Sequence, residues 1–282
     1  MKTKSLISLM LAIFIISISF ISCEKDPEKS PAILNVEDDI IAEMVYEDLF
    51  AEVDAAMDYM ESVLYGGMKK SESVVTCRTR TVEQPSDTVF WPRTITIDFG
   101  DGCTNPNGVI HKGKIITIVS SGKFWMEGHT RTTTLENYYV NGNIIEGTKV
   151  VSNEGKNSNG NLVFSETLTG GKVITPEGKE INREFARERE WVAGQNTPRI
   201  RLDDEYLVTG VVTGTNRKGL AYTRTINVPL HIKLACRWIV AGTIVSQAED
   251  MPEAILDYGN GECDSKATVT VNGDTKEISL HR

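Results

Sequence analysis

The sequence predicts a mainly β protein, in which a long antiparallel meander sheet (open, curved or sandwich-like) follows one N-terminal amphipathic helix. Three observations predict this class. Before Gly66 the apolar residues recur every three or four positions, which is the period of a helix. Beyond Ser73 the period changes to two, and β-branched and aromatic residues become frequent. Turn signals built from Gly, Asn and Pro separate the runs, so we expect ten or more strands.

Residues 1–22 have the pattern of a secretory signal peptide. Lys2 and Lys4 precede an uncharged apolar run, which is shorter than the roughly 20 residues that a transmembrane helix needs. The run ends in Phe20-Ile21-Ser22-Cys23, which resembles a bacterial lipobox with Phe20 in place of the usual Leu. The resemblance implies cleavage before Cys23 and attachment of lipid to its sulfur. The alternative is an ordinary secretory signal with an incidental cysteine.

Residues 23–35 are expected to form a flexible tether between the lipid and the fold, because charges and prolines oppose regular structure there. Glu24 follows the cysteine, where an aspartate would retain many lipoproteins in the inner membrane. Lys25-Asp26 resembles the charged export signal of bacteroidete-type surface lipoproteins. These residues favour anchoring in the outer membrane, with the fold facing the periplasm or the cell exterior.

Residues 36–65 form the predicted helix, and Gly66-Gly67 ends it. Its polar face carries ten acidic residues and no Lys or Arg. The formal charge of −9 becomes −11 without the signal, so these acids account for nearly all of it and argue against nucleic acid as a partner. The acidic face could bind Ca²⁺ or a basic partner, but acids spread along a helix are usually solvated, and we favour a solvated surface.

Residues 74–282 are expected to form one antiparallel β domain. Asn141-Gly142 is the strongest hairpin signal, because a type I′ turn needs two positive φ angles. The stretch from Lys179 to Glu190 has charged residues at both odd and even positions, and so on both faces of a strand. A strand that is polar on both faces does not sit between two packed layers. We therefore expect the middle of the sheet to be open or partly single-layered. Residues 181–191 fit a strand better than the helix that their spacing also allows.

The cysteines beyond Cys23 indicate an oxidising compartment, because they are even in number. Cys77 and Cys103 lie 26 residues apart, and Cys236 and Cys263 lie 27 apart. This spacing favours two local disulfides over the other two connectivities and over buried free thiols.

Two parts of the β region resemble one another. ITIDFGDGC precedes and includes the second cysteine of the first pair, and AILDYGNGEC does so in the second pair. We therefore predict duplicated disulfide units at about residues 74–119 and 233–280.

The repeated loops are also the best candidates for a metal site, which would bind calcium. Asp98 and Asp101 in the first loop and Asp257 and Asn260 in the second place oxygen side chains close together. Their spacing lacks the order of an EF-hand, so a tight turn that presents the cysteine is the preferred interpretation.

No catalytic motif is found, and no cofactor is expected. The four histidines are not at zinc spacing, and neither a nucleophile elbow nor a phosphate-binding loop occurs. The four tryptophans could stack on sugar rings, although burial is their more common role. A pair of carboxylates of the glycosidase type has no signature in one dimension.

Residues 74–280 resemble a group of uncharacterised bacteroidete-type outer-membrane lipoproteins. The similarity lies in the Cys-x-Trp strand Cys236-Arg237-Trp238 and in the loop Asp257-Tyr258-Gly259-Asn260-Gly261-Glu262-Cys263. The resemblance implies the location in the outer membrane and the fold, and it implies no activity.

The functional expectation is a lipid-anchored cell-envelope protein that acts as a non-enzymatic binding or structural module, with a protein, glycan or lipid as ligand. An alternative is a carrier of lipid or another apolar ligand, because a helix across a curved sheet can enclose an apolar cavity. A glycan-active hydrolase is the third hypothesis.

Overall fold

The computed structural model describes residues 31–65, 77–106, 108–197 and 200–280. Cys23, the signal peptide and Gly66-Gly67 lie outside these residues. The elements are α1 (Pro31–Tyr65), β1 (Thr79–Glu83), β2 (Arg93–Asp98), β3 (Cys103–Thr104), β4 (Ile110–Val119), β5 (Thr130–Val140), β6 (Asn143–Lys156), β7 (Leu162–Ile174), β8 (Glu180–Ala193), the 3₁₀ turn η1 (Arg201–Asp203), β9 (Glu205–Thr215), β10 (Ala221–Lys233), β11 (Ile239–Ala248), β12 (Ala254–Asn260), β13 (Lys266–Val271) and β14 (Asp274–Ser279).

The fourteen strands form one open antiparallel sheet, which confirms the predicted fold class. Each strand pairs with its neighbours in the chain, except that β3 forms a short side branch on β4. Asn141 and Gly142 have φ angles of 49° and 84°, as a type I′ turn requires. Residues 181–191 lie in strand β8, as expected.

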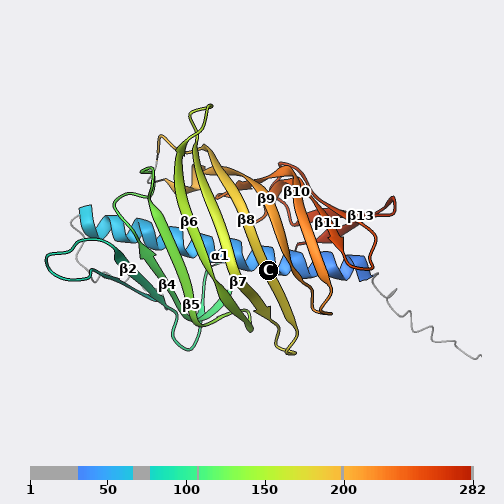
Figure 1. The fold of residues 1–282 in the computed structure, drawn as a ribbon, viewed down its shortest axis with the longest axis horizontal. Helices are drawn as coiled ribbons and strands as arrows, with labels where there is room; N and C mark the ends of the chain where they lie inside the picture. The colour runs from blue at the N-terminus through green and yellow to red at the C-terminus, as the bar shows by residue number, and fades with distance from the viewer. Residues whose placement is uncertain (1–30, 66–76, 107, 198–199, 281–282) are drawn as a thin grey trace, which may run out of the picture.

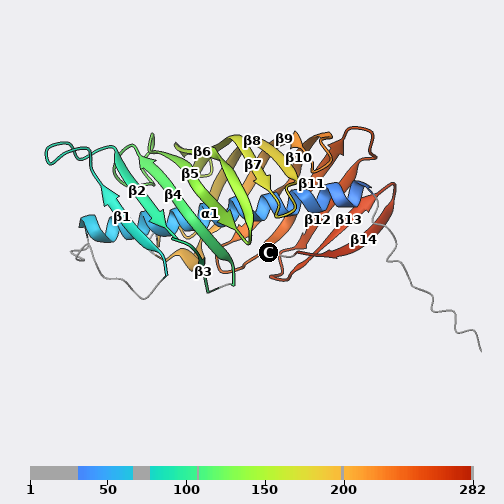
Figure 2. The same cartoon turned by 90° about the horizontal axis from the view of Figure 1, so that it is seen from below.

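Helix α1 lies along the concave side of this sheet, and the strands cross it obliquely along its whole length (Figure 1). Its N-terminal half lies beside β11 to β13, and its C-terminal half lies beside β1 and β2 (Figure 2). The two ends of the sheet therefore cover opposite ends of one helix.

The helix starts earlier than predicted. It begins at Pro31, so residues 31–35 belong to α1 and not to the tether. The physical reason is that proline suits the first position of a helix, where its fixed φ is favourable and its missing N–H would have no partner.

Two apolar clusters make up the core, one around each half of α1. The first packs Tyr46, Leu49 and Met57 of the helix against strands from β2 to β11. The second packs Val36 and Ile40 against strands from β6 to β13. The helix is therefore the common centre of both clusters. Within the described residues, no helix is long and apolar enough to cross a membrane.

Both predicted disulfides are confirmed, and each closes the open end of a hairpin. Cys77–Cys103 spans β1 and β2 with a Cα–Cα distance of 5.3 Å. Cys236–Cys263 spans β11 and β12 with a Cα–Cα distance of 5.7 Å. The two chain ends of the sheet are thus fastened in the same way.

Candidate binding site

The interface between α1 and the sheet contains a layer of buried charges. None of the ten acids of the helix is exposed, and five of them are buried: Asp38, Asp39, Glu43, Asp48 and Glu52. Seven of the ten pair with an arginine outside the helix. The interpretation of the acidic face as a solvated surface is therefore wrong. The basic partner of this face is the protein's own sheet.

Strand β8 supplies three of the buried cations. Arg183, Arg187 and Arg189 point toward α1 and are at most 1% exposed, whereas Glu184 and Glu188 on the opposite face are exposed. The charge of β8 therefore alternates in sign between its two faces. Strand β8 therefore packs against α1 on one face and is exposed on the other, so it does not sit between two packed layers. Its inner face can be charged because each of its three inward guanidiniums meets a carboxylate.

Glu43 is at the centre of this layer. It accepts hydrogen bonds from Arg183 and, through both oxygens, from Arg187. Burial would raise the pKa of Glu43, but the guanidiniums of Arg187 and Arg183 outweigh burial and lower this pKa to about 2. Glu43 is therefore ionised at neutral pH.

A second carboxylate extends the layer along the sheet. Glu166 on β7 accepts a hydrogen bond from Arg189 at 2.7 Å and lies 3.3 Å from the amine of Lys149. Arg189 also donates to Glu47 of the helix at 2.8 Å and lies over the ring of Phe50. These contacts fix the rotation of α1 about its own axis.

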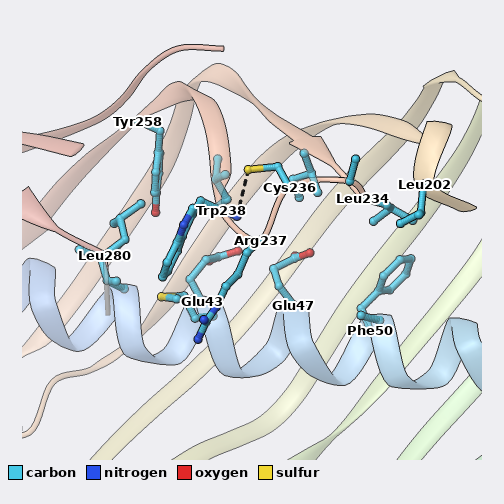
Figure 3. A pocket seen from close by; sticks show the side chains of 16 residues that line it. Glu43, Glu47, Phe50, Leu202, Leu234, Cys236, Arg237, Trp238, Tyr258 and Leu280 are labelled. Atoms are coloured by element: carbon cyan, nitrogen blue, oxygen red, sulfur yellow. Dashed lines mark hydrogen bonds between the residues drawn. The ribbon is translucent and has the colours of Figure 1, made fainter. Parts of the chain in front are cut away.

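A cavity of about 380 Å³ lies in front of the charge layer, between the N-terminal half of α1 and the loop that joins β10 to β11 (Figure 3). From α1 it is lined by residues at helical spacing: Ile40, Glu43, Met44, Glu47, Phe50 and Ala51. The walls facing the helix are formed by Leu202, Ile232, Leu234, Ala235, Cys236, Arg237, Trp238, Ile239, Tyr258 and Leu280. The lining is thus mostly apolar, as in ligand pockets of this size.

The Cys236–Cys263 disulfide holds the loop wall in place. Cys236 itself lines the cavity, and its sulfur accepts a hydrogen bond from the main-chain N–H of Trp238 at 3.4 Å. The Trp238 ring is half-buried and lies beside Arg237, whose guanidinium is 5.0 Å from the ring centroid. The wall therefore consists of a stapled loop with an aromatic inner side.

Tyr258 provides a polar group inside the cavity. Its side chain is 4% exposed, and its hydroxyl points toward the helix (Figure 3). Within the described part of the chain this hydroxyl has no hydrogen-bond partner. Burial raises the pKa of Tyr258 well above its usual value, so the hydroxyl keeps its proton and can donate a hydrogen bond.

Met44 also lines a second hollow of about 410 Å³ on the other flank of the helix. Its walls come from Val109 in the loop before β4 and from Val140 and Asn141 at the hairpin of β5 and β6. Met44 thus lines two cavities.

The residues predicted as calcium ligands lie at or near the ends of β2 and β12, and two of them accept hydrogen bonds from nearby main-chain N–H groups. Asp98 accepts a hydrogen bond from the N–H of Gly100 at 2.8 Å, and Asp257 accepts one from Gly259 at 2.8 Å. The described residues contain no group of His, Cys, Asp and Glu that could hold a metal ion. Asp101 and Asn260 belong to the same two segments, and neither residue lines the cavity.

The carboxylates of the cavity are unsuited to acid–base catalysis. Glu43 is fully paired with guanidiniums, and Glu47 is bound by Arg189. The carboxyl with the clearest upward shift is Asp204, whose pKa is raised to about 7 by burial and by Asp203, but it is outside the cavity and accepts from the Trp191 indole. Of the tryptophans, Trp191 is fully buried.

Comparison of this chain with protein-family models, with curated proteins and with solved structures finds no match. The cavity is therefore interpreted from its own residues. The two motifs singled out in the sequence meet at its wall, where one contributes Arg237 and Trp238 and the other contributes Tyr258.

Proposed function

We propose that this protein is a lipid-anchored protein of the bacterial outer membrane whose folded domain binds an apolar ligand and catalyses no reaction. The signal and the lipobox-like Phe20-Ile21-Ser22-Cys23 support the anchor, and their resemblance to bacteroidete-type lipoproteins supports the outer membrane. The oxidised cysteines agree with an extracytoplasmic address. Anchoring through acyl chains is strong, because each buried methylene contributes about 0.8 kcal/mol.

The observation that carries the binding function is the cavity between α1 and the β10–β11 loop. Its volume of about 380 Å³ compares with the roughly 150 Å³ in which an engineered apolar cavity holds benzene, so it accommodates a ligand of about fifteen non-hydrogen atoms. Leu202 at its rim is 71% exposed, and an exposed apolar residue beside an apolar cavity is typical of a ligand entrance. The size fits a single chain or a small ring system.

The binding function is tested with a neutral apolar probe. N-phenyl-1-naphthylamine is titrated into the chain carrying Cys23→Ala, which cannot be acylated, and its fluorescence is followed. We expect saturable binding at one site, and we expect Leu234→Trp to weaken it at least tenfold because the larger ring fills the cavity. Ile118→Trp, at a half-exposed position on β4 outside the cavity, is the matched control. Equal binding by the Leu234→Trp and Ile118→Trp chains, or no binding at all, would refute the proposal.

The anchor is tested separately in cells. A labelled fatty acid is expected to enter the wild-type protein and not the Cys23→Ala chain, and only the wild type is expected to stay with the membrane fraction. Unlabelled wild-type protein would exclude the lipoprotein address and leave the binding test unaffected.

A further inference from the structure

Some of the charged side chains that line the cavity form ion pairs within the protein, and one does not. Three charged side chains line it, and two of them, Glu43 and Glu47, are bound to arginines of β8 on their far side. Arg237 is the third, and it forms no ion pair with any residue that the structure describes. The one charge of the cavity that remains available to a ligand is therefore positive.

The position of Arg237 suits the recognition of an anion. Its side chain is exposed, and its guanidinium lies beside the Trp238 ring, which restricts the plane of the guanidinium. A guanidinium has several N–H donors in a planar fork that matches a carboxylate or a phosphate. Because Arg237 is exposed, it presents this fork at the rim rather than in the interior.

Tyr258 adds a second polar contact. The residue is 4% exposed, and its hydroxyl forms no hydrogen bond among the described residues and points into the cavity (Figure 3). A ligand oxygen that reaches this hydroxyl in a mostly apolar cavity gains a hydrogen bond that water makes less readily there. The apolar walls between these two groups fit a hydrocarbon chain.

We propose that this cavity binds a single-chain amphiphile with an anionic head group, a carboxylate or a phosphate. Arg237 pairs with the head group, Tyr258 donates a hydrogen bond to a ligand oxygen, and the chain lies against Met44, Leu234 and Leu280. The assignment rests on the proposed binding function and adds to it the chemical class of the ligand.

The test compares three ligands that share one chain length. Dodecanoate, dodecyl phosphate and dodecanol are titrated by calorimetry, below their aggregation concentrations, into the chain carrying Cys23→Ala. We expect both anions to bind about tenfold or more tightly than the alcohol, because a charged hydrogen bond is stronger than a neutral one. The two anions distinguish a fatty acid from a phosphate ester as the preferred head group.

Two variants assign the roles of the residues. Arg237→Gln is expected to reduce the preference for the anions over dodecanol to about one, while the affinity for dodecanol changes little. Tyr258→Phe is expected to weaken the binding of the preferred anion about fivefold, which corresponds to the loss of one hydrogen bond. Lys112→Gln removes an exposed cation that lies over the Tyr139 ring outside the cavity, and we expect it to change neither quantity.

The outcomes separate this inference from the proposed function. If dodecanol binds as tightly as the anions, or if Arg237→Gln keeps the preference, the anionic head group is excluded while an apolar ligand remains. A Tyr258→Phe chain with unchanged affinity would overturn the role of the hydroxyl and with it the assigned pose. If none of the three ligands and no naphthylamine binds, the proposed function itself fails.

Discussion

Replacing Glu43 by Gln tests whether the buried charge layer holds α1 in the sheet. The substitution keeps the shape of the side chain and removes its charge, which leaves Arg187 without its bidentate partner and Arg183 with only Asp39. All these groups are buried, so water cannot replace the lost carboxylate.

The expected loss can be worked out in two ways. The pKa of Glu43 falls from 4.5 to about 2 on folding, and this difference corresponds to about 3 kcal/mol between the charged and neutral side chain. Removing one partner of a buried ion pair typically costs about 3–5 kcal/mol. We therefore expect Glu43→Gln to lower the free energy of unfolding by about 3–4 kcal/mol at pH 7.

The assay is urea unfolding of the Cys23→Ala chain, followed by tryptophan fluorescence and far-UV circular dichroism. Glu188→Gln is the matched control, because Glu188 is exposed on the outer face of β8 and is expected to change the free energy of unfolding by less than about 0.5 kcal/mol. The pH dependence gives a second check. A carboxyl whose pKa is lowered on folding stabilises the fold above its unfolded pKa, and this contribution is lost as the pH falls from 4.5 toward 2. A loss below 1 kcal/mol for Glu43→Gln would refute the reasoning.

Two further predictions concern other buried groups. Burial and, to a smaller extent, Arg131 lower the pKa of His129 to about 4 in the folded protein. As the pH falls from 6.5 to 4, the unfolded chain therefore binds a proton before the folded protein does, and the free energy of unfolding decreases. His129→Gln removes this decrease, so the variant should lose less stability than the wild type between about pH 7 and pH 5. Asp204→Asn should shift the difference in free energy of unfolding between pH 7 and pH 5 in the opposite direction, because the raised pKa of Asp204 adds stability that is lost as the pH rises through about 7. Equal pH profiles for the two variants would contradict both assignments. Each disulfide closes a loop of 26 or 27 residues, so replacing either pair by alanines should lower the free energy of unfolding by about 3.5 kcal/mol, but only the loss of Cys236–Cys263 should also weaken binding of the naphthylamine probe.

The parts of the fold that depend on local patterning were predictable from the sequence. The period-two runs and the turn signals predicted the antiparallel meander, and the equal spacing of the cysteines predicted both disulfides. Residues close in sequence decide these features. Whether the meander stays open or closes on itself was not decided by these local signals, because consecutive antiparallel pairing allows both.

The charge layer depends on contacts between distant residues and was not predicted. Arg183 and Glu43 are 140 residues apart, and each alone has the appearance of an ordinary surface charge. A signal was nevertheless present, because the charged residues on the inward face of β8 are basic, those on its outward face are acidic, and the helix has acids without any Lys or Arg. Alternation in the sign of charge, and not only in hydrophobicity, can therefore mark a buried strand face when an oppositely charged helix exists elsewhere in the chain.

A cavity between helix and sheet was an alternative expectation, but the residues that line it were not predicted, because they come from five separate parts of the chain. Ile40 and Met44 of α1 were counted among the apolar residues of an amphipathic helix, Trp238 was considered for sugar stacking, and Tyr258 was noted as a motif member. Spacing along the sequence does not show that a helix face and two loops leave a gap between them. Only the curvature of the sheet brings them to one place.

The charge layer and the cavity share residues, which links stability to binding. Glu43 and Glu47 line the cavity and also bind the arginines of β8, so the ion pairs fix which helix face forms the cavity floor. Apolar residues surround much of α1 and specify its rotation poorly, and a shift of one residue would turn the face by about 100°. We therefore expect the double variant Glu43→Gln with Arg187→Met to regain most of the free energy of unfolding lost by Glu43→Gln, since a neutral packed pair often replaces a buried ion pair without loss. Naphthylamine binding by this double variant should remain weakened at least fivefold, because the floor is no longer held in one orientation. If binding recovers together with stability, the layer contributes only stability and does not orient the helix.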